Sequence, residues 1–311
     1  MTPAEFADQL SAFVTAFHAR VESRDGKHFL QIPGYEPLPW RAAIKKKFLS
    51  RRNPNNIFYE EAATAAFTYC LSRLPVSTVI DAGAQWGYFS ALTLAYVGRP
   101  IKPIAFEINP HAPVYLESLI AEAAKRGRHG EIMLSGLSDS HVGERDIWIS
   151  TTRMFESEPT EADYRDPWWV RLKMAMRGNK DRDIPQKFRV MITSLDHFCR
   201  ERNIVPDLIK IDVDGYEAKV VPGAMDVLSR HKPIVFLELH KKKFIARFGV
   251  TRRDIVKPLF DMGYQAVLID DHHDRSRAIV PVTLDSPQIS REATDMFIFF
   301  HPASIEKISA S

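Results

Sequence analysis

The sequence has 311 residues, of which 45% are hydrophobic and 26% charged, and its formal net charge is +3. This length allows a large buried core, and so small a net charge does not by itself indicate a nucleic-acid or membrane partner. Cys70 and Cys199 are too few for a disulfide framework or a structural zinc site. No signal peptide and no apolar run of roughly 18 residues are visible, so we expect a cytoplasmic protein.

Residues 1–75 differ in pattern from the rest and predict a helical extension. Apolar side chains recur at helical spacing near the start, namely Phe6, Leu10, Phe13, Val14 and Phe17. A Pro- and Gly-rich loop follows at 32–39, and a further helix is predicted over 60–74. Between them lies a basic stretch at 41–52, from Arg41 to Arg52. It is either a solvated helix face or a contact for a phosphorylated substrate or a membrane surface.

From residue 76 on, short apolar runs alternate with helical patterns, which predicts one α/β domain over 76–311. The predicted strands are 78–82, 103–106, 131–135, 207–211, 233–239, 265–269 and 296–300. The predicted helices are 88–97, 112–125, 217–229 and 252–262. This order is typical of a doubly wound, mainly parallel sheet of seven strands with helices on both faces.

A polar, Arg-rich stretch at 151–186 breaks this pattern and contains the adjacent Trp168 and Trp169. We interpret residues 150–187 as an insertion between the third and fourth core strands. A long insertion at such a point is more often functional than accidental. The stretch is therefore either a substrate lid or a disordered loop.

A glycine turn follows the first strand of the domain. Asp81 ends the strand, and Gly83 and Gly87 follow it four residues apart. This spacing matches neither the dinucleotide fingerprint nor the phosphate loop. Glycine lets the backbone approach a ligand closely, and an acid at the strand end suits a cationic group such as the amino group of methionine.

Glu107 ends the second strand, roughly 20 residues after the turn, where an acid can accept hydrogen bonds from two ribose hydroxyls. Asp81 and Glu107 together predict a nucleoside cofactor. The alternative is a flavodoxin-like fold with an acid there by chance. Ser138 and Asp139 follow the third strand on the same rim of the sheet. Asp139 either contacts an adenine amino group or caps a turn.

The fourth and fifth strands also end in polar groups. Asp212 and Asp214 follow the fourth strand, and Glu238 and His240 stand at the end of the fifth. The ends of the first and fourth strands lie side by side in such folds. We therefore expect these four side chains to face the reactive end of the cofactor.

Several motifs between residues 79 and 240 occur together in one known family. They are Thr-Ser-Leu-Asp at 193–196, Leu-Ile-Lys-Ile-Asp-Val-Asp-Gly-Tyr-Glu at 208–217, Pro-Gly-Ala at 222–224, Lys-Pro at 232–233 leading to Glu238, and the segments around Asp81, Glu107 and Asp139. Together they resemble the FkbM-type methyltransferases. The resemblance implies a class I, Rossmann-like fold with strand order 3-2-1-4-5-7-6, S-adenosylmethionine as cofactor, and O-methylation of a sugar, glycan or secondary-metabolite hydroxyl. The family usually has Glu at Asp214 and a small residue at Tyr216.

The predicted cofactor-binding residues are Asp81, Gly83, Gly87, Glu107, Ser138, Asp139 and Asp212. We expect His240 or Asp212 to act as general base toward the acceptor hydroxyl, because a histidine titrates in the useful pH range. Glu238 would orient His240 or the acceptor, and His240 could instead be only a capped strand end. We expect no metal, although Asp212, Asp214, Glu238 and His240 offer ligands for a divalent cation.

The expected acceptor is a hydroxylated small molecule or glycan, and we expect no nucleic-acid partner. A membrane contact through residues 41–52 is a further option. One alternative is a nucleic-acid methyltransferase that uses the basic stretch as its handle. However, the fourth strand carries no Asn-Pro-Pro-Tyr or Asp-Pro-Pro-Tyr motif. The other alternative is a non-catalytic partner protein that binds S-adenosylmethionine.

Overall fold

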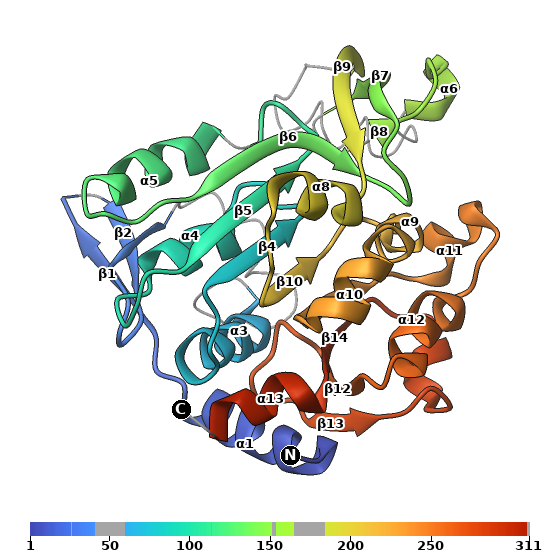
Figure 1. Ribbon diagram of the computed structural model, residues 1–311. Helices are drawn as coiled ribbons and strands as arrows, with labels where there is room; N and C mark the ends of the chain where they lie inside the picture. Colours follow the sequence, from blue (N-terminus) through green and yellow to red (C-terminus); the bar gives the residue numbers. More distant parts are fainter. Residues whose placement is uncertain (26, 41–59, 113, 151–153, 165–183, 310–311) are drawn as a thin grey trace, which may run out of the picture.

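A computed structural model describes residues 1–25, 27–40, 60–112, 114–150, 154–164 and 184–309 of the chain (Figure 1). Its centre is an eleven-stranded mixed sheet with the strand order β13-β12-β14-β11-β10-β4-β5-β6-β9-β7-β8. A separate three-stranded sheet, β1-β2-β3, lies near the N-terminus. Among the described residues, none of the helices is long and apolar enough to cross a bilayer.

Seven strands of the large sheet are those that the sequence predicts. They are β4 (Thr78–Ala82), β5 (Lys102–Glu107), β6 (Glu131–Leu137), β10 (Leu208–Ile211), β11 (Ile234–Leu239), β12 (Gln265–Ile269) and β14 (Asp295–Phe300). Their order, β6-β5-β4-β10-β11-β14-β12, is the 3-2-1-4-5-7-6 arrangement that the resemblance implied. β4, β5, β6, β10 and β11 pair in parallel, whereas β14 runs antiparallel to β11 and β12.

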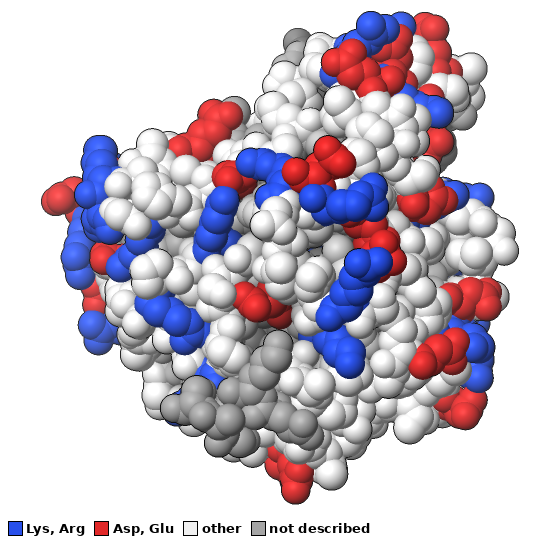
Figure 2. Space-filling view, viewed as in Figure 1, with Lys and Arg blue, Asp and Glu red and all other residues white. Residues whose placement is uncertain are grey.

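The predicted number of seven strands was too small. β13 (Ile279–Val282) extends one edge, and β9 (Gln186–Thr193), β7 (Gly143–Ile149) and β8 (Met154–Phe155) extend the other. β7 and β9 escaped prediction because strands with many exposed polar side chains show little apolar periodicity. β7 and β8, with the short α6 (Glu161–Tyr164), form the lobe that projects at the upper right of Figures 1 and 2.

Helices cover both faces of the sheet because neighbouring strand residues point to opposite sides. Val79 and Leu208 join one apolar cluster, whereas Ile80 and Ile209 join the other. The first face is covered by α1 (Pro3–Ala16), α3 (Glu61–Arg73), α4 (Tyr88–Ala95) and α5 (Val114–Ala124). The second is covered by α8 (Leu195–Arg202), α9 (Glu217–Val220), α10 (Met225–His231) and α12 (Arg252–Asp261). The remaining helical elements are η1 (Pro222–Ala224), α11 (Lys242–Ile245), η2 (Ala246–Phe248), η3 (Pro287–Ser290) and α13 (Pro302–Ser309).

The N-terminal segment begins with the predicted amphipathic helix, α1. Thr2 caps the helix in a capping box. Its side chain accepts a hydrogen bond from the Glu5 amide, and the Glu5 side chain accepts one from the Thr2 amide. The apolar face of the helix packs against α3, β12 and β13, and the ring of Phe6 lies 4.3 Å from that of Phe300. The strands β1 (Arg20–Arg24), β2 (Lys27–Gln31) and β3 (Leu38–Trp40) follow. The segment was predicted to be a helical extension, and these strands show that it is only partly helical.

Candidate active site

The glycine turn after β4 packs directly against the loop after β10. Gly83 has φ +79°, and a Cβ atom there would lie 1.9 Å from the carbonyl oxygen of Asp212. The amide of Asp212 donates to the carbonyl of Ala82 over 3.0 Å. Gly87 also has a positive φ, +76°, and a Cβ there would overlap Leu116. Only glycine permits this close approach, which joins the two predicted halves of the site.

Glu107, at the end of β5, holds the turn from the other side. Its Oε2 accepts from the Gln85 amide over 2.6 Å, and its Oε1 accepts from the Asn109 amide over 2.8 Å. Burial raises the pKa of Glu107, and these backbone donors oppose the rise. A carboxylate oxygen can accept more than one hydrogen bond, so the predicted ribose contact is compatible with this structural role.

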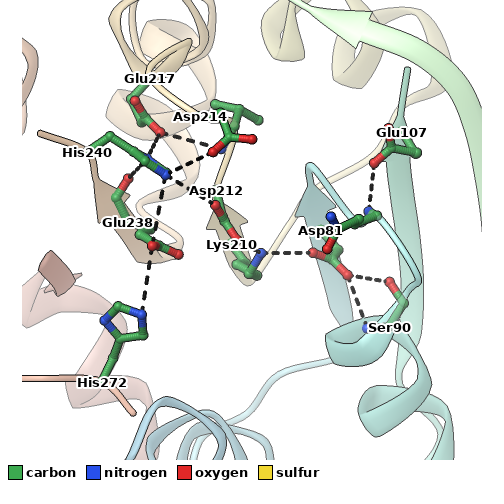
Figure 3. A network of polar contacts seen from close by, with 12 residues as sticks. Asp81, Ser90, Glu107, Lys210, Asp212, Asp214, Glu217, Glu238, His240 and His272 are labelled. Carbon is green, nitrogen blue, oxygen red and sulfur yellow. Dashed lines mark hydrogen bonds and ion pairs between the residues drawn. The ribbon is translucent and has the colours of Figure 1, made fainter. Parts of the chain in front are cut away.

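Asp81 is buried beneath the turn (Figure 3). Its Oδ2 accepts from the backbone amide and hydroxyl of Ser90, over 3.1 and 2.7 Å, and its Oδ1 lies 3.8 Å from Lys210 Nζ. These contacts fix the start of α4 and place one carboxylate beside a buried ammonium. The cofactor contact predicted for Asp81 stays a prediction.

The loop after β6 lies on the same rim. Asp139 forms an ion pair of 2.7 Å with Lys219 of α9, and this hydrogen bond lowers the pKa of Asp139. The Ser138 hydroxyl donates to Asp139 over 3.2 Å. Gly223 packs so closely that a Cβ there would lie 2.0 Å from the Ser138 carbonyl oxygen. The predicted contact of this loop with adenine is untested by these interactions.

Four carboxylates converge on His240 in an arrangement that we term the acidic cluster, comprising Asp212, Asp214, Glu217 and Glu238 (Figure 3). His240 Nδ1 lies 2.7 Å from Glu217 Oε1. On the other side of the ring, Nε2 lies 3.3 Å from Asp214 Oδ1 and 4.0 Å from both Asp212 Oδ1 and Glu238 Oε1. The predicted convergence of Asp212, Asp214, Glu238 and His240 is therefore present, and Glu217 is an additional member.

These carboxylates oppose the general-base role predicted for His240. Burial alone would lower the pKa of its imidazole, but hydrogen bonds to Asp214 and Glu217 outweigh burial and raise this pKa to about 11. A histidine with this pKa is protonated at neutral pH and has no lone pair to accept a proton. The prediction assumed an ordinary histidine pKa, because no sequence pattern reveals how many carboxylates will surround the ring.

Lys210 lies at the centre of the buried charges, although sequence reasoning gave it no role. Its Nζ is 3.1 Å from Asp212 Oδ2 and 3.8 Å from Asp81 Oδ1, and the residue is 3% exposed. Burial opposes ionisation of Lys210, but Asp212 and Asp81 raise its pKa above the ordinary value. Burial likewise opposes ionisation of Asp212, but the charges of Lys210 and His240 lower its pKa. The missed signal was a lysine inside a buried strand, where a charge needs a partner.

The sequence model of the Methyltransferase FkbM domain matches residues 81–266. The chain belongs to this family. The match covers the glycine turn, Glu107 and every residue of the acidic cluster. No curated protein matches the chain.

Solved structures offer only distant similarity to this FkbM family member. A methyltransferase FkbM from Methylobacillus flagellatus KT is 13% identical with a TM-score of 0.40, and the alignment covers 77% of this chain but 53% of that protein. The chain thus spans about half the length of that protein. An O-methyltransferase from Bacillus cereus in complex with SAH is 9% identical with a TM-score of 0.35, over 79% and 82% of the two chains.

Two groups of side chains in this family member could hold a metal ion. Asp212, Glu238 and His240 each offer one ligand atom, and these atoms lie within 4.8 Å of one another. Glu60, His272 and His273 form a second such group within the described part of the chain. His272, which sequence reasoning missed, lies with its Nε2 3.8 Å from Glu238 Oε1. It belongs to the loop after β12, and no motif marked it.

The predicted insertion contacts the site through Tyr216, one of the two departures from the family pattern. The Tyr216 hydroxyl donates to Glu156 Oε1 over 2.6 Å, and Arg247 stacks on the Tyr216 ring at 4.6 Å. This contact ties the segment after β8 to the start of α9. Trp168, Trp169 and the basic stretch at 41–52 lie outside the described residues.

Proposed function

We propose that this FkbM family member transfers a methyl group from S-adenosylmethionine to a hydroxyl oxygen of a sugar, glycan or secondary metabolite. The observation that carries the proposal is the contact between the glycine turn and the acidic cluster, through Gly83 and Asp212. A cationic sulfonium is attracted to a site that holds several carboxylates. A nucleic-acid acceptor would bring phosphates toward those same carboxylates, so the charge of the site supports a neutral hydroxylated acceptor instead.

The residues at the site suit the cofactor. Glu107 ends β5 with two acceptor oxygens for ribose hydroxyls, and the glycines at 83 and 87 carry no side chain at two positions of the turn. Asp81, Ser138, Asp139 and Asp212 complete the proposed cofactor set. When bound, S-adenosylmethionine supplies the methyl group, whose carbon–sulfur bond breaks with its electron pair staying on sulfur as the carbon–oxygen bond forms.

The acidic cluster would position the acceptor and receive its proton. Lys210 and His240 keep Asp212 ionised, so we assign the proton of the acceptor hydroxyl to Asp212. His240, protonated in this arrangement, would orient Asp212 and the acceptor as a donor. Glu238 differs, because burial and the nearby Asp212 charge raise its pKa well above the usual range.

Calorimetric titration with S-adenosylmethionine tests the proposal. We expect binding to the wild type and about 10- to 100-fold weaker binding to Glu107→Gln, the loss expected when a charged hydrogen-bond acceptor is neutralised. Asp226→Asn is the matched control, because Asp226 is an exposed acid on α10 whose side chain is 59% exposed. No binding at millimolar cofactor would overturn the proposal.

A second assay tests the acceptor. Purified protein, cofactor and a panel of glycans and hydroxylated metabolites are incubated, and methylated products are detected by mass spectrometry. We expect a mass gain of one methyl group on oxygen. Methylation of RNA alone would favour the nucleic-acid alternative, and cofactor binding without transfer to any acceptor would favour the non-catalytic one.

A further inference from the structure

We propose that Asp212, Glu238 and His240 form a binding site for a divalent transition-metal cation. Their ligand atoms lie within 4.8 Å of one another, and His240 Nε2 lies 4.0 Å from an oxygen of each acid (Figure 3). Ligand atoms that each lie roughly 2.1 Å from one ion are about 3 to 4 Å apart. Small side-chain adjustments therefore suffice for all three groups to reach a common ion.

The orientation of His240 is that of a metal ligand. Its Nδ1 donates to Glu217 Oε1 over 2.7 Å, and Glu217 is fully buried. This bond fixes the ring and turns Nε2 toward Asp212 and Glu238 (Figure 3). Histidines that bind metals usually donate their other ring nitrogen to a carboxylate in this way.

Glu238 is placed to contribute one ligand atom to the ion. The residue is 7% exposed, and its Oε1 lies 3.8 Å from His272 Nε2 and 4.0 Å from His240 Nε2. A cation bound between Glu238 and Asp212 would offset the cost of burying their negative charges.

The charges at the site also favour a cation. The four acidic side chains of the acidic cluster surround His240, and Lys210 pairs with Asp212 among them. An ion bound to His240 Nε2 would take the place of the proton on that nitrogen. The two oxygens of Asp212 contact different groups: Oδ2 lies toward Lys210 and Oδ1 toward His240. Asp214, whose side chain is 90% exposed, is free to add an oxygen or leave room for an acceptor.

The ligand set selects the class of metal. Two carboxylates and one imidazole suit Mn²⁺ or Zn²⁺, whereas Mg²⁺ and Ca²⁺ prefer oxygen ligands throughout. In the reaction, which rests on the proposed function, the ion would coordinate the acceptor hydroxyl and lower its pKa. Binding of the ion itself does not depend on that function.

Mn²⁺ titration of the chelator-treated full chain tests the site, with free Mn²⁺ followed by electron paramagnetic resonance. We expect one tightly bound Mn²⁺ per chain in the wild type. Glu238→Gln and His240→Gln should weaken Mn²⁺ binding at least about a hundredfold, because each removes a ligand rather than a group that only orients one. Glu217→Gln, which removes only the orienting carboxylate, should weaken binding about tenfold. Asp226→Asn is the control and should bind like the wild type.

Folding is checked by thermal unfolding without metal. Glutamine matches glutamate in size and removes the repulsion between Glu238 and Asp212, so Glu238→Gln should melt at or above the wild-type temperature. Mn²⁺ should then raise the melting temperature of the wild type and leave that of Glu238→Gln unchanged.

Three outcomes would overturn the site. They are no Mn²⁺ binding at millimolar concentration, wild-type binding by Glu238→Gln, and binding that is lost only when His273 is replaced. Titration with S-adenosylmethionine in the presence of chelator separates this failure from failure of the proposed function.

Discussion

Replacing Lys210 by methionine should destabilise the protein strongly, because it leaves Asp81 and Asp212 without their buried counter-charge. The ammonium lies 3.1 Å from one carboxylate and 3.8 Å from the other. With an effective dielectric constant of about 20, Coulomb's law gives attractions of about 5 and 4 kcal/mol. The cost of desolvating the ammonium offsets much of this attraction. The cost of burying both carboxylates, however, persists in the variant, so we expect a loss of about 3–5 kcal/mol.

The assay is urea unfolding at neutral pH, followed by far-UV circular dichroism. Methionine preserves most of the buried aliphatic stem, so the change removes mainly the charge. Lys219→Met is the matched control, since Lys219 pairs with Asp139 over the shorter distance of 2.7 Å but both side chains are 39% exposed. The control should lose no more than about 1 kcal/mol. Equal losses in the two variants would refute the argument that burial decides the cost.

The pH dependence provides a second check on the same variant. The pKa of Asp212 is lowered in the folded protein, so its contribution to stability is present above the unfolded value and is lost as pH falls below it. Lys210→Met loses this contribution. The difference in unfolding free energy between wild type and variant should therefore be largest near neutral pH and shrink below about pH 4. A difference that stays constant down to pH 3 would contradict the assigned cause.

Two further variants test how the loops are held. Gly83→Ala should abolish cofactor binding in calorimetry, because the new Cβ would lie 1.9 Å from the Asp212 carbonyl oxygen. Gly127→Ala is the control, since Gly127 has a similar φ but nothing lies within 4 Å of the position of its new Cβ, and this variant should bind the cofactor normally. Equal binding by the two variants would show that the close approach is unimportant. Tyr216→Phe removes the 2.6 Å hydrogen bond to Glu156 and should speed tryptic cleavage of the insertion about two- to tenfold. An unchanged cleavage rate relative to wild type would exclude Tyr216 as the anchor.

The predicted strands and the helices that cover them could be read from the sequence because each buried element carries its own apolar periodicity. β4 and β12 have the predicted bounds, and the other five core strands differ by one or two residues at an end. β7 and β9 could not be predicted in the same way, because their exposed polar residues are stabilised by pairing with distant strands. β1, β2 and β3 in the N-terminal segment pair with strands close in sequence, and they escaped prediction because they are short and β1 and β2 are only partly buried.

The sequence predicted most of the residues that meet in the acidic cluster, but it did not predict their ionisation. Asp212, Glu238 and His240 occupy ends of adjacent parallel strands, and topology alone brings such positions together. The raised pKa of His240 depends on Asp214 and Glu217, which reach the ring from the turn before α9 and from α9 itself, respectively. That effect requires distances of a few ångströms, which spacing along the chain does not specify.

The sequence by itself determined the family, the order of the core strands and the rim of the sheet on which the polar residues gather. These properties follow from local periodicity and from motifs that are contiguous along the chain. Tertiary structure alone decided that Lys210 neutralises Asp81 and Asp212, that four acidic side chains surround His240 and raise its pKa, and that Glu238 faces His240 and His272. The physical reason is that charge and burial act through space, so the ionisation of each group depends on neighbours contributed by distant segments.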